Sequence, residues 1–172
     1  TFLTAKGIGC GNSLIEPDML DTARDIFEKA YRNRKYIYLP IDHIITQEFS
    51  PDAPSKQVAR NGIEEGWMGM DIGPLTIEKY TNALYDAKTV FWNGPMGVFE
   101  FPRFAVGTNA IANVLASLPN ATTVIGGGDS VSAVKKAGVS DKMSHISTGG
   151  GASLELIEGK VLPGVAALMD RK

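Results

Sequence analysis

The sequence is poor in cysteine and histidine. Its 172 residues include one cysteine, Cys10, and two histidines, His43 and His145. A single cysteine excludes an internal disulfide and a cysteine metal cluster, and it is typical of a reducing compartment. No carboxylate lies at ligand spacing from either histidine, so we interpret both as structural residues rather than as a metal pair.

Long apolar runs and an excess of basic charge are also absent. No apolar run reaches the roughly 18 residues that a membrane-spanning helix needs. The 17 basic and 19 acidic residues give a formal net charge of −2, and no clustered basic face of the kind that binds nucleic acid is present. We therefore expect a cytoplasmic protein with no membrane partner and no nucleic-acid partner.

Two common phosphate-binding motifs are missing as well. The glycines at 7, 9 and 11 do not have the G-x-G-x-x-G spacing and do not follow a strand. The pair Gly159-Lys160 is followed by Val161 and has no glycine five residues upstream. Nicotinamide chemistry and P-loop hydrolysis therefore both lack their signature.

The sequence does contain three short apolar runs that each end in a glycine-rich turn and lead into a helix-like stretch. A strand that ends in such a turn presents bare backbone N–H groups and the positive end of a helix dipole, which together favour phosphate. The three runs are Thr89-Val90-Phe91-Trp92-Asn93-Gly94-Pro95, Thr123-Val124-Ile125-Gly126-Gly127-Gly128-Asp129-Ser130 and His145-Ile146-Ser147-Thr148-Gly149-Gly150-Gly151.

Hydrophobic periodicity predicts alternating strands and helices along the chain. Near-continuous apolar strands in such an order favour an α/β fold, a Rossmann-like parallel sheet with helices on both faces. Because parallel strands end at one edge of the sheet, the three turns are expected to meet there. The expected strands are 36–40, 67–72, 89–93, 122–125 and 145–147, and the first of these could continue to residue 45. The expected helices are 17–34, 77–87, 103–118, 130–137 and 150–158, with Thr76 as the N-cap of the second. Residues 47–66 are expected to form a loop that could include an edge hairpin.

Each turn also has a purely structural interpretation. Asp129 could hold Mg²⁺, which takes one or two carboxylates and then phosphate oxygens, or it could simply cap a helix. The glycines at 149–151 could serve only close packing. Val98 and Phe99 could form an apolar slot with Glu100 on a ribose diol, but taken alone the more economical interpretation places both apolar side chains in the core.

Taken together and in order, the motifs resemble those of the phosphoglycerate kinase family over essentially the whole chain. Single glycine turns are common, whereas the full ordered set is highly specific. The matching segments are Thr1-Phe2-Leu3, Tyr38 to His43, Gly66 to Pro74, Trp92 to Glu100, Ile125 to Ser130, Ser144 to Glu155 and Leu162 to Val165.

The resemblance implies a two-domain glycolytic kinase, of which residues 1–172 form an incomplete C-terminal domain. In that family the C-terminal domain binds ADP or ATP with Mg²⁺, and the N-terminal domain binds 3-phosphoglycerate. A phosphoryl group passes between 1,3-bisphosphoglycerate and ADP, so a carboxyl group is the acceptor in the reverse direction. The full-length parent protein, of which this chain is a part, is expected to be monomeric. This chain is expected to be inactive alone.

The resemblance also implies a role for individual residues. Asp129 is the expected metal ligand, and Glu100 the expected ribose contact. The adenine pocket is expected to consist of Leu14, Gly69, Met70 and Val98. The turn that faces the triphosphate is expected to be Asn93, Gly94 and Pro95, with further phosphate contacts at Gly126, Gly127, Gly128 and Ser130. Backbone donors to the transferring phosphoryl group are expected at Thr148, Gly149 and Gly150.

The family's lysine-bearing Gly-Ala-Lys loop and its basic triose-binding domain are expected upstream of Thr1. Two further hypotheses remain open from the sequence. One is a nucleotide-binding module without catalysis, and the other is a structural α/β domain whose glycines serve packing only.

Overall fold

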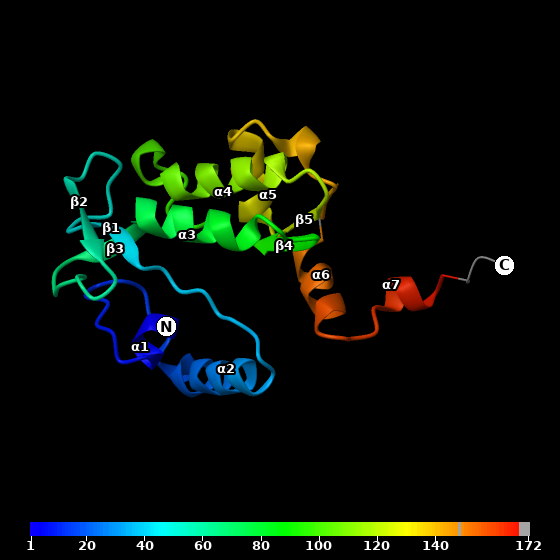
Figure 1. Ribbon diagram of the computed structural model, residues 1–172, viewed down its shortest axis with the longest axis horizontal. Coiled ribbons are helices and arrows are strands. Elements are labelled where there is room, and N and C mark those ends of the chain that lie inside the picture. Colours follow the sequence, from blue (N-terminus) through cyan, green and yellow to red (C-terminus); the bar gives the residue numbers. More distant parts are fainter. Residues whose placement is uncertain (148, 169–172) are drawn as a thin grey trace. The chain divides into compact units, whose positions relative to one another are not determined.

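A computed structural model describes residues 1–147 and 149–168 of the protein (Figure 1). The chain divides into two compact units. Unit 1 comprises residues 1–83 and 96–111, and unit 2 comprises 84–95 and the described residues from 112 onward. The predicted site residue Thr148 lies outside the described residues. Within the described residues no helix is long and apolar enough to cross a membrane.

Unit 2 contains the parallel sheet that the sequence predicts. Its strands β4 (Thr89–Asn93), β5 (Thr122–Gly126) and β6 (His145–Ile146) lie in that order, and both pairings are parallel. Helix α5 (Gly128–Lys136) follows β5, and α6 (Gly150–Ile157) follows β6 (Figure 1). Unit 2 also contains the short helix α7 (Pro163–Ala166) and the 3₁₀ turn η3 (Ser140–Lys142). The predicted α/β class is confirmed.

The core of unit 2 explains why these segments become strands and helices. Ile125 on β5 is fully buried, as is Val134 on α5. β-branched residues suit a strand that is covered on its faces. Asn93 and Gly126 are register partners, so β4 and β5 end side by side at the same edge. The sheet thereby sets the positions of the turns that follow.

Unit 1 contains a second sheet that is antiparallel, contrary to the expectation of parallel strands throughout. β1 (Asp42–Thr46) lies between β2 (Ser55–Ala59) and β3 (Met68–Ile72). The connection 47–54 between β1 and β2 is too short for the crossover that a parallel pairing of these two strands would need. Of the edge hairpin suggested within 47–66 only one strand forms there, β2, which lies at the edge of the sheet and pairs with β1.

The predicted strand at 36–40 is wrong, because the ladder begins only at Asp42. Within the described residues no strand pairs with this segment, and Pro40 has no N–H to donate to a ladder. Its carbonyl groups bond side chains of α3 (Pro74–Leu84) instead: the Tyr80 hydroxyl donates to Tyr38 O at 3.1 Å and Lys79 Nζ donates to Leu39 O at 3.2 Å.

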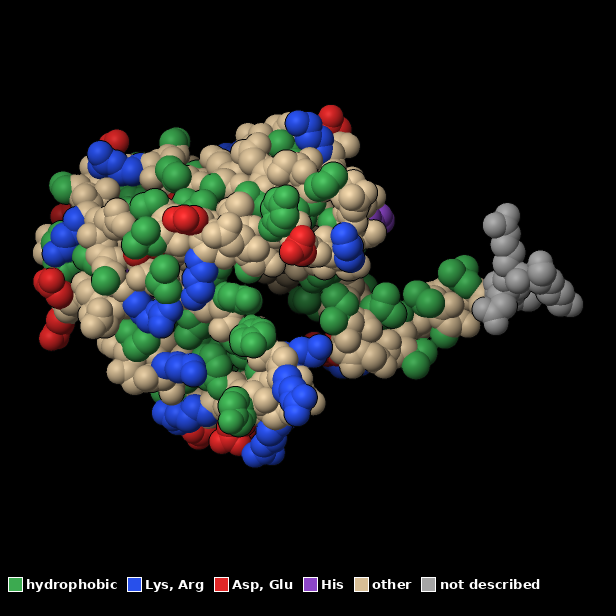
Figure 2. Space-filling model, in the orientation of Figure 1, with side chains coloured by type: hydrophobic (Ala, Val, Ile, Leu, Met, Phe, Trp, Pro, Cys, Tyr) green, Lys and Arg blue, Asp and Glu red, His purple; other side chains and the backbone are tan. Residues whose placement is uncertain are grey.

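The predicted N-terminal helix forms as η1 (Pro17–Met19) and α2 (Leu20–Arg32), preceded by the single turn α1 (Phe2–Ala5). Of the predicted apolar face of α2, Ala23 is buried, whereas Ile26 and Tyr31 are 39% and 86% exposed. Basic and apolar side chains gather over α2 and the segment after it (Figure 2). The described residues therefore leave part of this face uncovered.

Helix α3 begins at Pro74, so Thr76 lies inside the helix and is not its N-cap as predicted. The Asp42 carboxylate on β1 takes that part. It accepts hydrogen bonds from the N–H groups of Leu75 at 3.0 Å and Thr76 at 2.8 Å, and also from the Thr76 hydroxyl and the Gln57 amide.

The segment 102–117 forms η2 (Pro102–Phe104) and α4 (Val106–Ser117), close to the helix predicted at 103–118.

The hydrogen bonds to Asp42 decide its ionisation. Burial alone raises the pKa of this carboxyl group, but the donors from Thr76, Leu75 and Gln57 outweigh it and hold the pKa below the ordinary value of 3.8. The charged carboxylate thus stabilises unit 1 above pH 3.8, and this contribution is lost as the pH falls through the folded-state pKa.

We predict that Asp42→Asn lowers the free energy of unfolding at pH 7 by about 1–3 kcal/mol, because buried donors lose a charged acceptor. Urea unfolding measured from pH 7 downward tests this, and the difference from wild type should shrink at acid pH. Asp25→Asn on the exposed face of α2 is the matched control. An equal loss in both variants, or a loss that does not depend on pH, would contradict the assignment of Asp42 as the charged cap.

Candidate functional site

The three predicted turns of unit 2 meet at one edge of the sheet. The Gly94 N–H donates to Ser130 Oγ at 2.6 Å, which joins the turns after β4 and β5. A Cβ on Gly150 would lie 2.7 Å from both the N and the Cα of Gly127. Since real Cβ contacts are not that short, the turn after β6 approaches the turn after β5 backbone to backbone. The predicted convergence is confirmed for the described residues.

Gly127 gives the second turn its conformation. Its φ of 83° lies in the left-handed region, and a Cβ there would lie 2.7 Å from Asn93 Oδ1. It is the N-cap of α5 and, as a glycine, supplies no side-chain hydrogen bond to the first N–H groups of that helix. Gly149 likewise precedes α6 without a side-chain cap. Both helix ends therefore offer N–H groups and positive dipole to an anion.

Two polar side chains of the second turn differ in their surroundings. Ser130 is 1% exposed, and its hydroxyl oxygen accepts the Gly94 N–H, so it holds two turns together. Asp129 is exposed in the first turn of α5. Among the described residues no group of three or more His, Cys, Asp or Glu side chains could hold a metal by itself. The exposed carboxylate fits a cation such as Mg²⁺ that fills its other positions with ligand oxygens and water.

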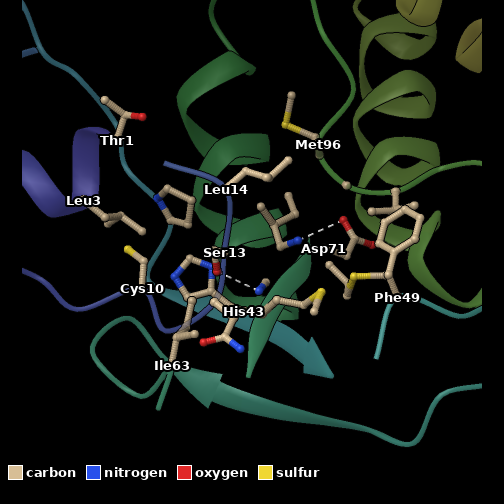
Figure 3. A pocket seen from close by; sticks show the side chains of 18 residues that line it. Thr1, Leu3, Cys10, Ser13, Leu14, His43, Phe49, Ile63, Asp71 and Met96 are labelled. Carbon is tan, nitrogen blue, oxygen red and sulfur yellow. Dashed lines mark hydrogen bonds between the residues drawn. The ribbon is translucent and has the colours of Figure 1, made fainter. Parts of the chain in front are cut away.

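Unit 1 contains a cavity of about 590 Å³ that is mostly apolar (Figure 3). This size is typical of pockets for small organic ligands. It brings together all four residues of the predicted adenine pocket. Ser13 Oγ accepts the Gly69 N–H at 2.9 Å and so ties the Leu14 segment to β3. The lining residues are Thr1, Leu3, Cys10, Asn12, Ser13, Leu14, Pro40, His43, Phe49, Ile63, Met68, Gly69, Met70, Asp71, Ile72, Met96, Gly97 and Val98.

The sequence missed several of these walls. Phe49 lies in the segment that was predicted as a loop, and it is 63% exposed although it is aromatic. His43 and Cys10 are buried in the wall, and Nε2 of His43 has no hydrogen-bond partner. Burial of the His43 imidazole lowers its pKa, although the nearby Asp42 carboxylate opposes this shift. The His43 imidazole in the pocket wall is therefore uncharged near neutral pH.

Val98, Phe99 and Glu100 agree in part with the predicted ligand slot and in part with the purely structural interpretation. Val98 lines the pocket, whereas Phe99 is 6% exposed and belongs to the core. Glu100 is exposed just after them. The structural alternative, with both apolar side chains in the core and Glu100 solvated, therefore agrees with the buried Phe99 and the exposed Glu100 but not with Val98.

The Val98 side of the pocket is fixed by two buried polar residues. Asp71, 5% exposed, accepts the Gly107 N–H at the start of α4 at 2.7 Å. Thr108 Oγ1 accepts the N–H of Met96 at 3.1 Å, and the Val98 N–H donates to Met70 O at 2.8 Å. Strand β3, the turn at 96–98 and helix α4 are thus held together around the cavity.

Burial dominates the ionisation of Asp71. Burial raises the pKa of Asp71 to about 6, although hydrogen bonds from the N–H groups of Gly107, Ile72 and Val106 lower it. Sequence reasoning did not single out this residue, because an aspartate before Ile-Gly-Pro carries no local signal of burial.

Comparison with protein families gives a consistent result. The family model described as phosphoglycerate kinase matches residues 1–160. Among curated proteins, phosphoglycerate kinase of Synechococcus elongatus is 58% identical over 99% of this chain and 43% of its own length. An Arabidopsis thaliana protein named phosphoglycerate kinase 3, cytosolic, is 57% identical over 98% of this chain and 42% of its own length.

Two solved structures agree with the sequence comparisons. Phosphoglycerate kinase from Coxiella burnetii has a TM-score of 0.92 at 39% identity, covering 96% of this chain and 42% of that protein. The enzyme from Pyrococcus horikoshii has a TM-score of 0.82 at 34% identity, covering 97% and 42%. The chain thus spans less than half the length of the relatives it matches.

We predict that Gly150→Ala destabilises the protein by about 1–3 kcal/mol, because the added methyl group meets backbone that cannot move as a side chain can. Gly151→Ala is the matched control in the same helix, where a Cβ meets nothing within 4 Å; it should be neutral or stabilising by up to about 1 kcal/mol. Thermal unfolding of both variants measures the difference. Equal stability of the two would show that the turns do not need this close approach.

The raised pKa of Asp71 makes a second prediction. The folded state binds a proton that the unfolded state has already released, so the stabilisation is complete below the ordinary pKa of 3.8 and is lost as the pH rises through about 6. Between pH 4 and 7 this amounts to about 2–3 kcal/mol of unfolding free energy. Urea unfolding across this range should show the decline, and Asp71→Asn should remove it. A decline that persists in the variant would assign it to other groups.

Proposed function

The chain belongs to the phosphoglycerate kinase family, and on this premise we propose that it is the nucleotide-binding part of an enzyme with that activity. The parent protein would transfer a phosphoryl group between 1,3-bisphosphoglycerate and ADP, giving 3-phosphoglycerate and ATP. Residues 1–172 would be the incomplete C-terminal domain of this glycolytic enzyme.

The meeting of three glycine turns in unit 2 is the observation that carries this proposal. Exposed N–H groups at the starts of α5 and α6, within reach of the turn after β4, suit a chain of phosphates. We assign the phosphate contacts to the β4 turn of Asn93, Gly94 and Pro95 and to the β5 turn of Gly126, Gly127, Gly128 and Ser130. Ser130 keeps a hydroxyl proton to donate while its oxygen accepts the Gly94 N–H.

The cavity of unit 1 would receive the base. Its walls at Leu14, Gly69, Met70 and Val98 are largely apolar and offer flat contact area for an aromatic ring. Glu100, exposed two residues beyond Val98, would accept hydrogen bonds from the ribose hydroxyl groups. Adenine nucleotides with Mg²⁺ are therefore the proposed ligands.

Asp129 would hold Mg²⁺. The carboxylate is exposed and lies at the turn where the phosphates would bind, so it can supply one oxygen ligand. When bound, the cation neutralises negative charge on the phosphate oxygens.

The backbone N–H groups of Thr148, Gly149 and Gly150 would donate to the transferring phosphoryl group. Such a transfer depends on positioning and on stabilisation of developing charge rather than on a nucleophile from the protein. We propose that the site for 3-phosphoglycerate and the cationic side chains belong to the rest of the parent, so that this chain alone is inactive. A monomeric parent in the cytosol is proposed too; one relative carries the word cytosolic in its name.

We predict that Asp129→Asn in the full-length parent weakens magnesium-dependent ADP binding by at least about tenfold. Mutation of a residue that only supports a metal ligand already lowers metal affinity by about 10- to 100-fold. Calorimetric titration of ADP with and without Mg²⁺ measures this. ADP affinity without the metal should change little.

Asp141→Asn, in the exposed turn η3 of the same unit, is the control variant. Unchanged affinity in Asp129→Asn would remove this residue from the metal site. Binding without any phosphoryl transfer in the parent would favour a non-catalytic nucleotide-binding module instead.

A further inference from the structure

We propose that Arg103 is a positioning residue that holds the aromatic ring of Phe49 in the wall of the base pocket. The inference rests on the proposed function, because it concerns the same pocket of unit 1. It adds a residue that neither the motifs nor the family resemblance singled out.

The segment 47–54 between β1 and β2 carries Phe49 to the cavity. Phe49 lines the pocket and is 63% exposed (Figure 3). The segment is closed at its start by Thr46 Oγ1, which donates to Glu48 O at 2.8 Å. Near its end Ala53 is 4% exposed and serves as an anchor. An exposed phenylalanine on an irregular loop needs such restraints to keep one position.

Arg103 supplies the restraint at the far end of the loop. Its Nη1 donates to Ala53 O at 2.8 Å and lies 3.4 Å from Asp52 O. The arginine is exposed in η2, so its role does not depend on filling the core. A charged donor to a backbone carbonyl is stronger than a neutral one.

The ring of Phe49 also contacts the segment that carries Arg103. The ring centroids of Phe49 and Phe101 lie 5.1 Å apart, and Phe101 is 6.5 Å from the fully buried Phe104. The Phe101 N–H donates to Val98 O at 3.1 Å. The segment 98–104 therefore joins the Val98 wall of the pocket to the loop that forms its Phe49 wall.

The expected consequence is specific to the base. If Arg103 is truncated, the loop keeps its internal hydrogen bonds but loses the link to η2. A ligand that packs on Phe49 must then order the loop when it binds, which weakens affinity. A ligand without a base makes no such contact, and its affinity should not change.

The experiment uses the full-length parent and Mg-ADP as the probe. Arg103→Ala should raise the KM and the Kd for Mg-ADP about threefold to tenfold, the range expected when one charge-assisted hydrogen bond is lost, while kcat changes less than about twofold. Arg103→Lys should recover part of the loss, since its ammonium group can still donate to one carbonyl group. Phe49→Ala should weaken Mg-ADP binding as well.

The double variant separates positioning from a general structural effect. Because Arg103 acts through Phe49, Arg103→Ala should add little to Phe49→Ala. Tripolyphosphate with Mg²⁺ is the base-free control ligand. Arg32→Ala, which removes an exposed ion pair with Glu28 on α2, is the control variant. Faster hydrogen exchange of the Ala53 amide in Arg103→Ala reports the loosened loop directly.

Fully additive effects, an equal loss of tripolyphosphate affinity, or unchanged Mg-ADP binding in Arg103→Ala would each overturn the inference and leave the proposed function intact. A wild-type parent that binds no Mg-ADP would overturn the proposed function and this inference with it.

Discussion

The close approach of the Gly150 backbone to the Gly127 backbone is the constraint on which the site in unit 2 depends. No side chain can stand between them, because a Cβ on Gly150 would lie 2.7 Å from Gly127. Parallel strands already bring their carboxyl ends to one edge, but ordinary side chains would keep the turns apart. The glycines remove that separation, so that peptide N–H groups from different turns can serve one ligand. The site is therefore built chiefly from backbone.

Unit 1 depends instead on two buried carboxylates that each accept N–H groups at the start of a distant helix. Asp42 does so for α3 and Asp71 for α4. Their pKa values shift in opposite directions, lowered for Asp42 and raised for Asp71. Asp42 has a hydroxyl group and a side-chain amide in addition to backbone N–H groups, and these outweigh burial. Asp71 has backbone N–H donors only, and burial prevails. The balance between burial and hydrogen bonding thus sets the direction of each pKa shift.

The sequence predicted those parts of the fold that depend on local pattern. The turns after β4, β5 and β6 could be found because an apolar run, glycines and a helix pattern lie next to one another in the chain. The segment 36–40 has an equally good strand pattern, but a strand also needs a partner, and within the described residues none pairs with it. Thr76 has the right side chain for an N-cap, yet Asp42, 34 positions away, takes that role. Partners distant in sequence leave no local trace.

The same reasoning explains why the base pocket could be predicted only in part. Leu14, Gly69, Met70 and Val98 could be named because the family resemblance implies them, and the last three lie within its matching segments. Phe49 and Arg103 could not, since the arginine donates to backbone carbonyl groups 50 positions away. A carbonyl acceptor is present at every residue, so neither Asp52 nor Ala53 needs a particular side chain for this contact. The geometry is set by the path of the backbone between β1 and β2. A contact of this kind, on which the proposed role of Arg103 rests, can therefore be found only from a structure.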